Sequence, residues 1–188
     1  MVQKSILAKC LLILLITSCA KEKEKEENPF LITDGKIGLL HTNTQLKDLD
    51  SVFKKDSIVK NVVDNGFSRR NEVLIYDKKG NILLILDPAK EFDSTSTIGN
   101  IQIKDKRYKT SEGLNVESTF KDITTHYKIS RIENTLRTAV IFLDEIDSYI
   151  TIDKEYITGD ARYNTDIPIE PSQIPDDAKI KHFWIGWK

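Results

Sequence analysis

The chain has 188 residues, with 28 basic and 29 acidic side chains and a net charge of −1. This even balance argues against a nucleic-acid-binding protein, which concentrates positive charge on one face. Both cysteines lie before residue 20, so the rest of the chain has no disulfide, no thiolate nucleophile and no cysteine-based metal site.

The start of the chain has the pattern of a secretory signal peptide. Lys4 and Lys9 supply positive charge, residues 10–16 are all apolar, and Thr17 and Ser18 are small. An apolar run of this length is far shorter than the roughly 20 residues that a helix needs to cross a bilayer. The leader is therefore expected to direct export and not to anchor the protein.

The segment Ile16-Thr17-Ser18-Cys19 is similar to the lipobox of bacterial lipoproteins. The resemblance implies that residues 1–18 are removed and that Cys19 becomes the lipidated first residue; an ordinary signal peptide that leaves a free thiol is the alternative. Buried acyl chains contribute about 0.8 kcal/mol per CH₂, so two or three of them hold a protein on a membrane without a transmembrane helix.

A charged spacer follows the cysteine. Residues 21–27 are all lysine or glutamate, so they have no apolar surface to bury and predict an extended tether. The run loosely resembles the charged tags of surface-exposed Bacteroidetes lipoproteins, and a plain spacer with the domain facing the periplasm is the alternative. We therefore divide the chain into a signal peptide, a lipidated cysteine with its tether (19–29), and a single globular domain (30–188).

The first half of the domain predicts a strand, a short amphipathic helix and three further strands. The helix is indicated by a cap at Asn43-Thr44 and by Leu46, Leu49 and Phe53 at i, i+3 and i+7. A five-residue connection with a glycine, 77–81, joins two of the strands as a hairpin. The predicted strands are 36–40, 58–63, 73–76 and 82–86.

The second half predicts a similar order. A cap at Glu117-Ser118 precedes Phe120, Ile123 and Tyr127, which again have the spacing i, i+3, i+7. Three prolines between 165 and 177 predict a loop before the last strand. The predicted strands are 98–104, 129–132, 139–143, 148–152 and 180–187.

The two predicted helices indicate an internal repeat. The segment from Thr44 to Phe53 aligns with that from Ser118 to Tyr127 without a gap; lysine and aspartate are identical and every apolar position is kept. Chance similarity between short amphipathic helices is the alternative. The predicted fold is α+β, with antiparallel sheets, two short helices on one face and a duplicated β-α-β-β-β unit.

Four short segments along the domain carry a family resemblance: 32–38 with 44–46, 98–105, 113–120 and 178–187. They resemble the sigma-E-regulated (RpoE-regulated) envelope lipoproteins of enteric bacteria, a family without an assigned activity. The chain departs from that family in the middle hairpins and in lacking cysteines within the domain. The resemblance implies an exported α+β lipoprotein of the outer membrane and supplies no catalytic residue.

A search for catalytic or metal-binding patterns finds none. His41, His126 and His182 have no ligand spacing, so a structural role is expected for each. Three carboxylates between Asp144 and Asp147 lack the spacing of a calcium loop and predict a solvated turn. Phosphate and dinucleotide motifs are absent from the sequence. We expect no catalytic residue, no metal and no cofactor.

The last predicted strand is the best candidate for a ligand-binding surface. Phe183 and Trp187 alternate with His182 and Trp184, and aromatic side chains of this kind stack on sugars or peptides. We take His182, Trp184 and Trp187 as the candidate ligand-binding residues, with a place in the core as the alternative.

These observations predict a non-enzymatic lipoprotein of the outer membrane that binds or supports another component of the cell envelope. Its partners would be the membrane, through lipid on Cys19, and an envelope protein, glycan or lipid, but not nucleic acid. The domain could face the periplasm or the cell surface. The alternatives are a hydrolase of envelope polymers, with His182 or the carboxylates of 144–147 as candidate groups, and an immunity-type inhibitor. The mature chain has a net charge of −3, because Lys4 and Lys9 are lost, and this surplus is too small to favour the inhibitor.

Overall fold

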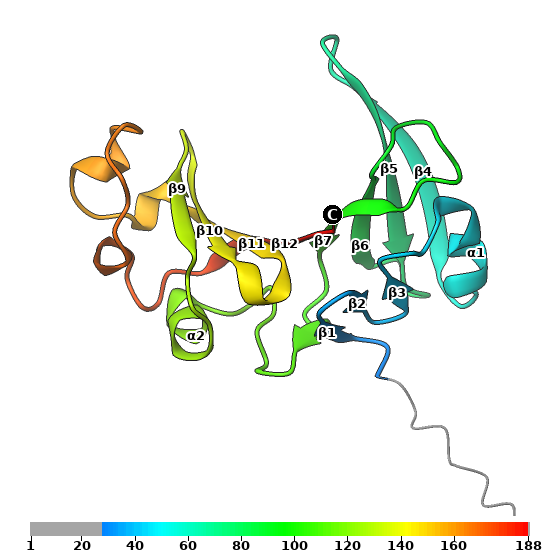
Figure 1. The fold of residues 1–188 in the computed structure, drawn as a ribbon, viewed down its shortest axis with the longest axis horizontal. Coiled ribbons are helices and arrows are strands. Elements are labelled where there is room, and N and C mark those ends of the chain that lie inside the picture. Colours follow the sequence, from blue (N-terminus) through cyan, green and yellow to red (C-terminus); the bar gives the residue numbers. More distant parts are fainter. Residues whose placement is uncertain (1–27, 188) are drawn as a thin grey trace, which may run out of the picture.

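The computed structural model describes residues 28–187 and contains two sheets (Figure 1). The larger sheet has eight antiparallel strands in the order β4-β5-β6-β7-β12-β11-β10-β9. The strands of this sheet, in that order, are β4 (Ser57–Asp64), β5 (Arg69–Tyr76), β6 (Ile82–Pro88), β7 (Ile98–Ile103), β12 (Ile180–Gly186), β11 (Ser148–Asp153), β10 (Thr138–Leu143) and β9 (Arg131–Asn134).

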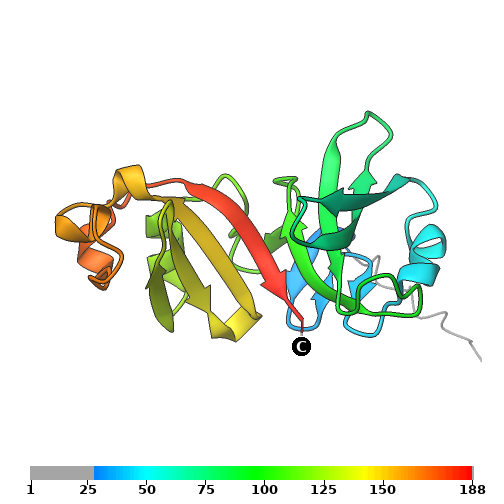
Figure 2. The same cartoon turned by 90° about the horizontal axis from the view of Figure 1, so that it is seen from above.

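This sheet consists of two four-stranded meanders that meet at the centre. Strands β4 to β7 follow one another in sequence and in space, and β9 to β12 do the same. The two meanders join where β7 pairs antiparallel with β12. Figures 1 and 2 show the resulting two lobes, with β12, in red, running from one lobe to the junction.

A small four-stranded sheet lies beside the junction, in the order β3-β2-β1-β8. It is formed by β1 (Leu31–Thr33), β2 (Lys36–Ile37), β3 (Leu40–His41) and β8 (Lys109–Thr110). The pairing of β1 with β8 is parallel and connects the beginning of the domain with its middle. The prediction of one strand over 36–40 was therefore inaccurate, because a turn at Gly38 divides the segment into β2 and β3.

Both predicted helices are present and are short. The first begins as a 3₁₀ turn, η1 (Leu46–Asp48), and continues as α1 (Leu49–Val52); the second is α2 (Phe120–His126). The predicted apolar triads of both helices are buried in the core. Helix α2 begins one residue later than expected, with Thr119 as N-cap, and the Thr119 N–H donates to Asp122 Oδ2 at 2.7 Å.

The backbone hydrogen bonds around the two helices are equivalent, with donors offset by 74 residues and acceptors offset by 82. Leu46 N–H donates to Ser96 O, and Phe120 N–H donates to Ala178 O. One residue later, Lys47 N–H donates to the carbonyl oxygen of residue 94 and Lys121 N–H to that of residue 176. Isolated bridges join Gln45 to Thr97 and Thr119 to Lys179. Each helix is thus attached to the residues just before the last strand of its own meander.

The repeated unit differs from the predicted β-α-β-β-β unit in its extent. Strand β7 closes the first meander and does not open the second, and its counterpart is the last strand, β12. Each unit therefore carries four strands after its helix. The α+β class, mainly antiparallel with two short helices, is confirmed.

Alternation along the strands separates two faces of the large sheet. In β10, Ala139, Ile141 and Leu143 are fully buried, whereas Val140 and Phe142 between them are partly exposed. The buried side chains of neighbouring strands share one face and form a single core with the helices and the small sheet. We call the opposite face uncovered, because most of its side chains are partly or fully exposed; Leu74, Gln102 and Thr151 are buried exceptions.

Candidate functional site

One row of side chains runs across the whole uncovered face of the large sheet. Register pairs link one residue from each of the eight strands into this row. We call it the cross-sheet row, and its members in spatial order are Arg131, Phe142, Tyr149, Trp184, Gln102, Ile85, Leu74 and Val59. Neighbouring strands lie about 4.8 Å apart, so the row spans roughly 34 Å.

Four consecutive members of the row stack on one another. The Arg131 guanidinium lies 3.4 Å from the centre of the Phe142 ring. The Phe142 and Tyr149 ring centres are 6.0 Å apart, and Tyr149 and Trp184 are stacked at 5.8 Å with an interplanar angle of 4°. Cross-strand aromatic pairs of this kind stabilise a sheet. Both faces of the Phe142 and Tyr149 rings are occupied by neighbours, so mainly ring edges remain available to a ligand.

A hydrogen-bonded pair adjoins the stack. Gln102 Nε2 lies 3.1 Å from His182 Nδ1. An amide nitrogen can only donate, so Gln102 Nε2 is the donor and His182 Nδ1 the acceptor. The neutral ring then carries its proton on Nε2. Burial, followed by the positive charges of Lys104 and Lys181, lowers the pKa of His182 below its usual value of 6.5. The imidazole is therefore neutral at pH 7, which makes it a hydrogen-bonding group and not a charge.

Polar groups border the stack on its other side. Tyr149 Oη donates to Asn100 Oδ1 at 3.2 Å, and burial raises the pKa of the Tyr149 phenol. Asp87 pairs with Asn100 across the strands, and its Oδ1 is buried without a hydrogen-bond partner. Burial is the main cause that raises the pKa of Asp87, and Glu72 and Glu91 add to it. The ionised form of this carboxyl group is therefore poorly solvated.

The structure brings two of the predicted ligand-binding residues together and separates the third. His182 and Trp184 lie on the uncovered face, two residues apart on β12, and both are partly exposed. Trp187 lies on the other face and is 8% exposed, so it is a core residue and the prediction that it binds a ligand was wrong. Cys19 lies outside the described residues.

Sequence reasoning missed the other members of the stack, Arg131, Phe142 and Tyr149. The outward positions of Phe142 and Tyr149 on predicted strands were a usable signal, because Ile141 and Ile150 beside them are buried aliphatic residues. Their common row depends on strand register, which no local pattern encodes.

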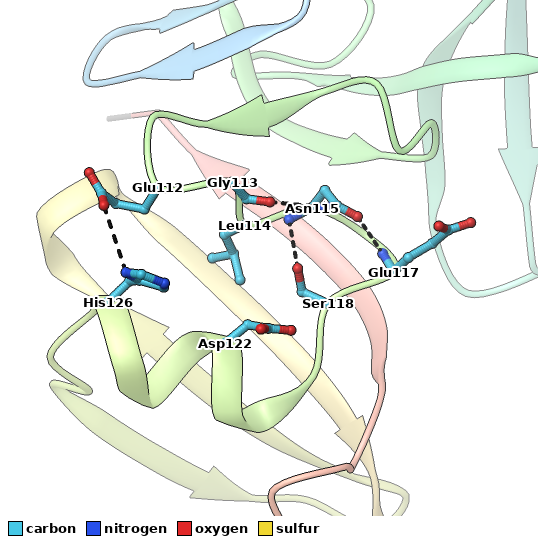
Figure 3. A pocket seen from close by; sticks show the side chains of 8 residues that line it. All are labelled: Glu112, Gly113, Leu114, Asn115, Glu117, Ser118, Asp122 and His126. Carbon is cyan, nitrogen blue, oxygen red and sulfur yellow. Dashed lines mark hydrogen bonds and ion pairs between the residues drawn. The ribbon is translucent and has the colours of Figure 1, made fainter.

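A second concave region lies beside α2 and is shown in Figure 3. It has a volume of about 290 Å³ and is lined by Glu112, Glu117, Asp122 and His126, among others. His126 Nδ1 lies 3.7 Å from Glu112 Oε2. Within residues 28–187, no group of three or more histidine, cysteine, aspartate or glutamate side chains is arranged to share a metal ion. The carboxylates of this pocket point in different directions in Figure 3.

The internal repeat shows which parts of this pocket belong to the fold. Asn115 N–H donates to Ser118 Oγ at 3.1 Å, and 74 residues earlier His41 N–H donates to Thr44 Oγ1 at 3.0 Å. The same turn therefore precedes both helices. At the same offset, Val52 replaces His126, so this histidine is not a requirement of the repeated framework.

No helix in residues 28–187 is long and apolar enough to cross a membrane. No protein-family model and no curated protein matches the chain. Among solved structures, it is similar to the crystal structure of the uncharacterized protein yfeY from Escherichia coli, with a TM-score of 0.56 and 11% sequence identity. The match covers 82% of this chain and 98% of that one. At this identity the similarity shows the fold alone.

Proposed function

We propose that this protein is a non-enzymatic binding protein of the bacterial outer membrane, attached through lipid on Cys19. The cross-sheet row is its docking surface for another protein of the envelope. The observation that carries the proposal is the uncovered face of the large sheet, where the partly exposed rings of Phe142, Tyr149 and Trp184 stack beside the exposed Arg131. Partly exposed aromatic surface beside an arginine is typical of protein interaction sites.

The stacking geometry favours a protein partner over a glycan. Sugars bind aromatic residues through ring faces, and the faces of Phe142 and Tyr149 are already occupied by neighbouring side chains. Ring edges with a flanking arginine suit apolar and carboxylate side chains, and interfaces between proteins are enriched in tyrosine, tryptophan and arginine.

Site-specific photo-crosslinking in intact cells tests this function with the native anchor present. A photoreactive phenylalanine analogue at Phe142 is expected to give one reproducible protein adduct. The matched control is the same analogue at Tyr163, which is 83% exposed and lies outside the large sheet. Trp184→Ala, combined with the analogue at Phe142, should reduce the adduct about tenfold, which corresponds to 1.4 kcal/mol of lost affinity.

Two results would reject the proposal. Equal adducts at Phe142 and Tyr163 would show that the face has no preferred partner. Turnover of a cell-wall or lipid substrate by the purified protein, lost on His182→Ala, would favour the hydrolase instead.

A further inference from the structure

Exposed apolar side chains gather on and beside one hairpin. The β4–β5 hairpin projects from its lobe in Figure 1, with Phe67 fully exposed at its tip. Val62 on β4 and Phe92 in the adjacent loop are 53% and 57% exposed. Together with Val59, they make up four of the seven large hydrophobic side chains that are exposed in residues 28–187. Single exposed apolar residues are ordinary, but a local concentration indicates a contact surface.

Phe92 is held in an unfavourable backbone conformation. Its φ angle of 58° lies in the left-handed region, which bulky residues rarely adopt. The Phe92 N–H donates to Asn71 Oδ1 at 3.0 Å, and the Asn71 N–H donates to Glu91 Oε2 at 2.7 Å. These two bonds fix the exposed ring beside the hairpin. Strain maintained in this way is typical of residues that contact a partner.

The outer edge of β4 is free of any other strand in the described chain. β4 pairs with β5 alone, over all eight of its residues. Val62 lies opposite Asn71, and the Asn71 N–H bonds to Glu91 on the side away from β4. Val62 and Asn71 are therefore a non-hydrogen-bonded pair of the β4–β5 ladder. Such pairs alternate with hydrogen-bonded pairs along an antiparallel ladder, so the backbone N–H and C=O groups of Lys60, Val62 and Asp64 point away from β5, towards the free edge.

We propose that β4 pairs antiparallel with β4 of a second copy of this chain, centred on Val62. In this register Val62 meets the partner's Val62, and Lys60 of each strand lies opposite the partner's Asp64. Pairing centred on Lys60 would instead place two lysines opposite each other, and pairing centred on Asn61 would place Lys60 opposite valine. Among these three registers, the charges favour the one centred on Val62.

The existing ion pairs of these residues do not prevent the pairing. Lys60 Nζ lies 3.7 Å from Asp50, and Asp64 lies 3.6 Å from Arg69. Both pairs are exposed at the surface, where such contacts contribute little. Replacing these two ion pairs with contacts to a second copy therefore costs little free energy.

The proposed dimer extends the same kind of junction that β7 and β12 make within one chain. Val62 lies on the face of the sheet that bears the core, next to Asn71 and Phe92, so the two copies of Phe92 flank the central valines. The twofold axis is perpendicular to the sheet, so both core-bearing faces point the same way. Ile32 of β1 packs into the core on that face, so the two copies of β1 lie on the same side of the dimer.

Cysteine crosslinking of the full chain in membranes tests the register. Val62→Cys should form a disulfide-linked dimer, because directly opposed residues have Cα atoms about 5.5 Å apart. Asp64→Cys is the matched control: its partner copy would lie four residues away along the strand, at about 14 Å. The parent chain, without an introduced cysteine, gives the background. Equal yields at the two positions would overturn the proposal, as would a Val62→Cys adduct to a different protein.

Charge exchange tests the selection of the register. Lys60→Asp is expected to lower the Val62→Cys dimer yield about tenfold, because each aspartate then faces another aspartate. Adding Asp64→Lys should restore the yield, because the pairs are re-formed with reversed charge. Thermal unfolding of each variant monitors folding. A double variant that is no better than Lys60→Asp alone, with normal unfolding, would reject the proposed pairing.

Discussion

Gly38 occupies a position that no other residue fits. Its φ angle is +56°, and a Cβ atom added there would lie 2.2 Å from the carbonyl oxygen of Pro29. Its N–H also donates to Leu31 O at 2.8 Å, which extends the β1–β2 pairing up to the turn between β2 and β3. The turn therefore requires glycine for both conformation and space.

We predict that Gly38→Ala lowers the free energy of unfolding by at least about 2 kcal/mol. Gly80→Ala is the matched control, because Gly80 has a φ angle of +82° and no atom within 4 Å of an added Cβ. That variant should lose only about 1 kcal/mol. Denaturant unfolding measures both, and equal losses would show that the contact with Pro29 is unimportant.

Asp87 predicts a pH-dependent gain in stability on substitution. Its pKa is raised in the folded protein, so folding favours the protonated form, and its contribution to stability falls as the pH rises through that pKa. Asp87→Asn should raise the melting temperature at pH 7, where the buried carboxylate is charged, and should have almost no effect at pH 3. A larger rise in melting temperature at pH 3 than at pH 7 would contradict the raised pKa of Asp87.

At the residue scale, the sequence predicts which side chains face inward better than it predicts what they meet. The positions of Phe183, Ile185 and Trp187 in the core follow from simple alternation, and all three are buried. The same alternation places Trp187 and Trp184 on opposite faces, so the candidate set of His182, Trp184 and Trp187 could not form one surface. The stack of Trp184 on Tyr149 required strand register that no local pattern supplies.

At the scale of elements, β12 is the strand on which the continuity of the large sheet depends. It pairs with β11 on one side and with β7 on the other, and so joins the two meanders. We predict that deleting residues 180–188 abolishes cooperative unfolding, because the deletion removes a central strand and its buried aromatic residues. Deleting Lys188 alone is the control. A deletion variant with an unchanged melting temperature would contradict this placement.

The helices and most strands were predictable because their signals are local. Apolar spacing located α1 and α2, and a glycine-containing turn located the β5–β6 hairpin. The strands β1 and β8 were missed because each has only two or three residues and depends on a distant partner. The extent of the repeat was misjudged for the same reason, since only pairing shows that β7 and β12 are counterparts.

For the whole molecule, the membrane attachment stays a prediction that one variant decides. Cys19→Ala should move the protein from the membrane fraction to the soluble fraction, because it removes the attachment point of the acyl chains. Lys4→Ala is a control outside the modified residue. Mass spectrometry of the cell-derived protein checks the modification directly, and an unmodified Cys19 thiol would remove the basis for the proposed location.

The junction of β7 with β12 also has a consequence for how the chain reaches its native state. The strands from β4 to β7 and from β9 to β11 are joined by short connections, so their hairpins close small loops quickly. Phe183 and Ile103 at the junction are far apart in the chain, and the entropy lost on closing so long a loop makes their pairing slow. We expect the strands of each meander to associate first and the pairing of β7 with β12 to form last. A nascent chain released before β12 has been synthesised would therefore have a folded first lobe and an incomplete second lobe.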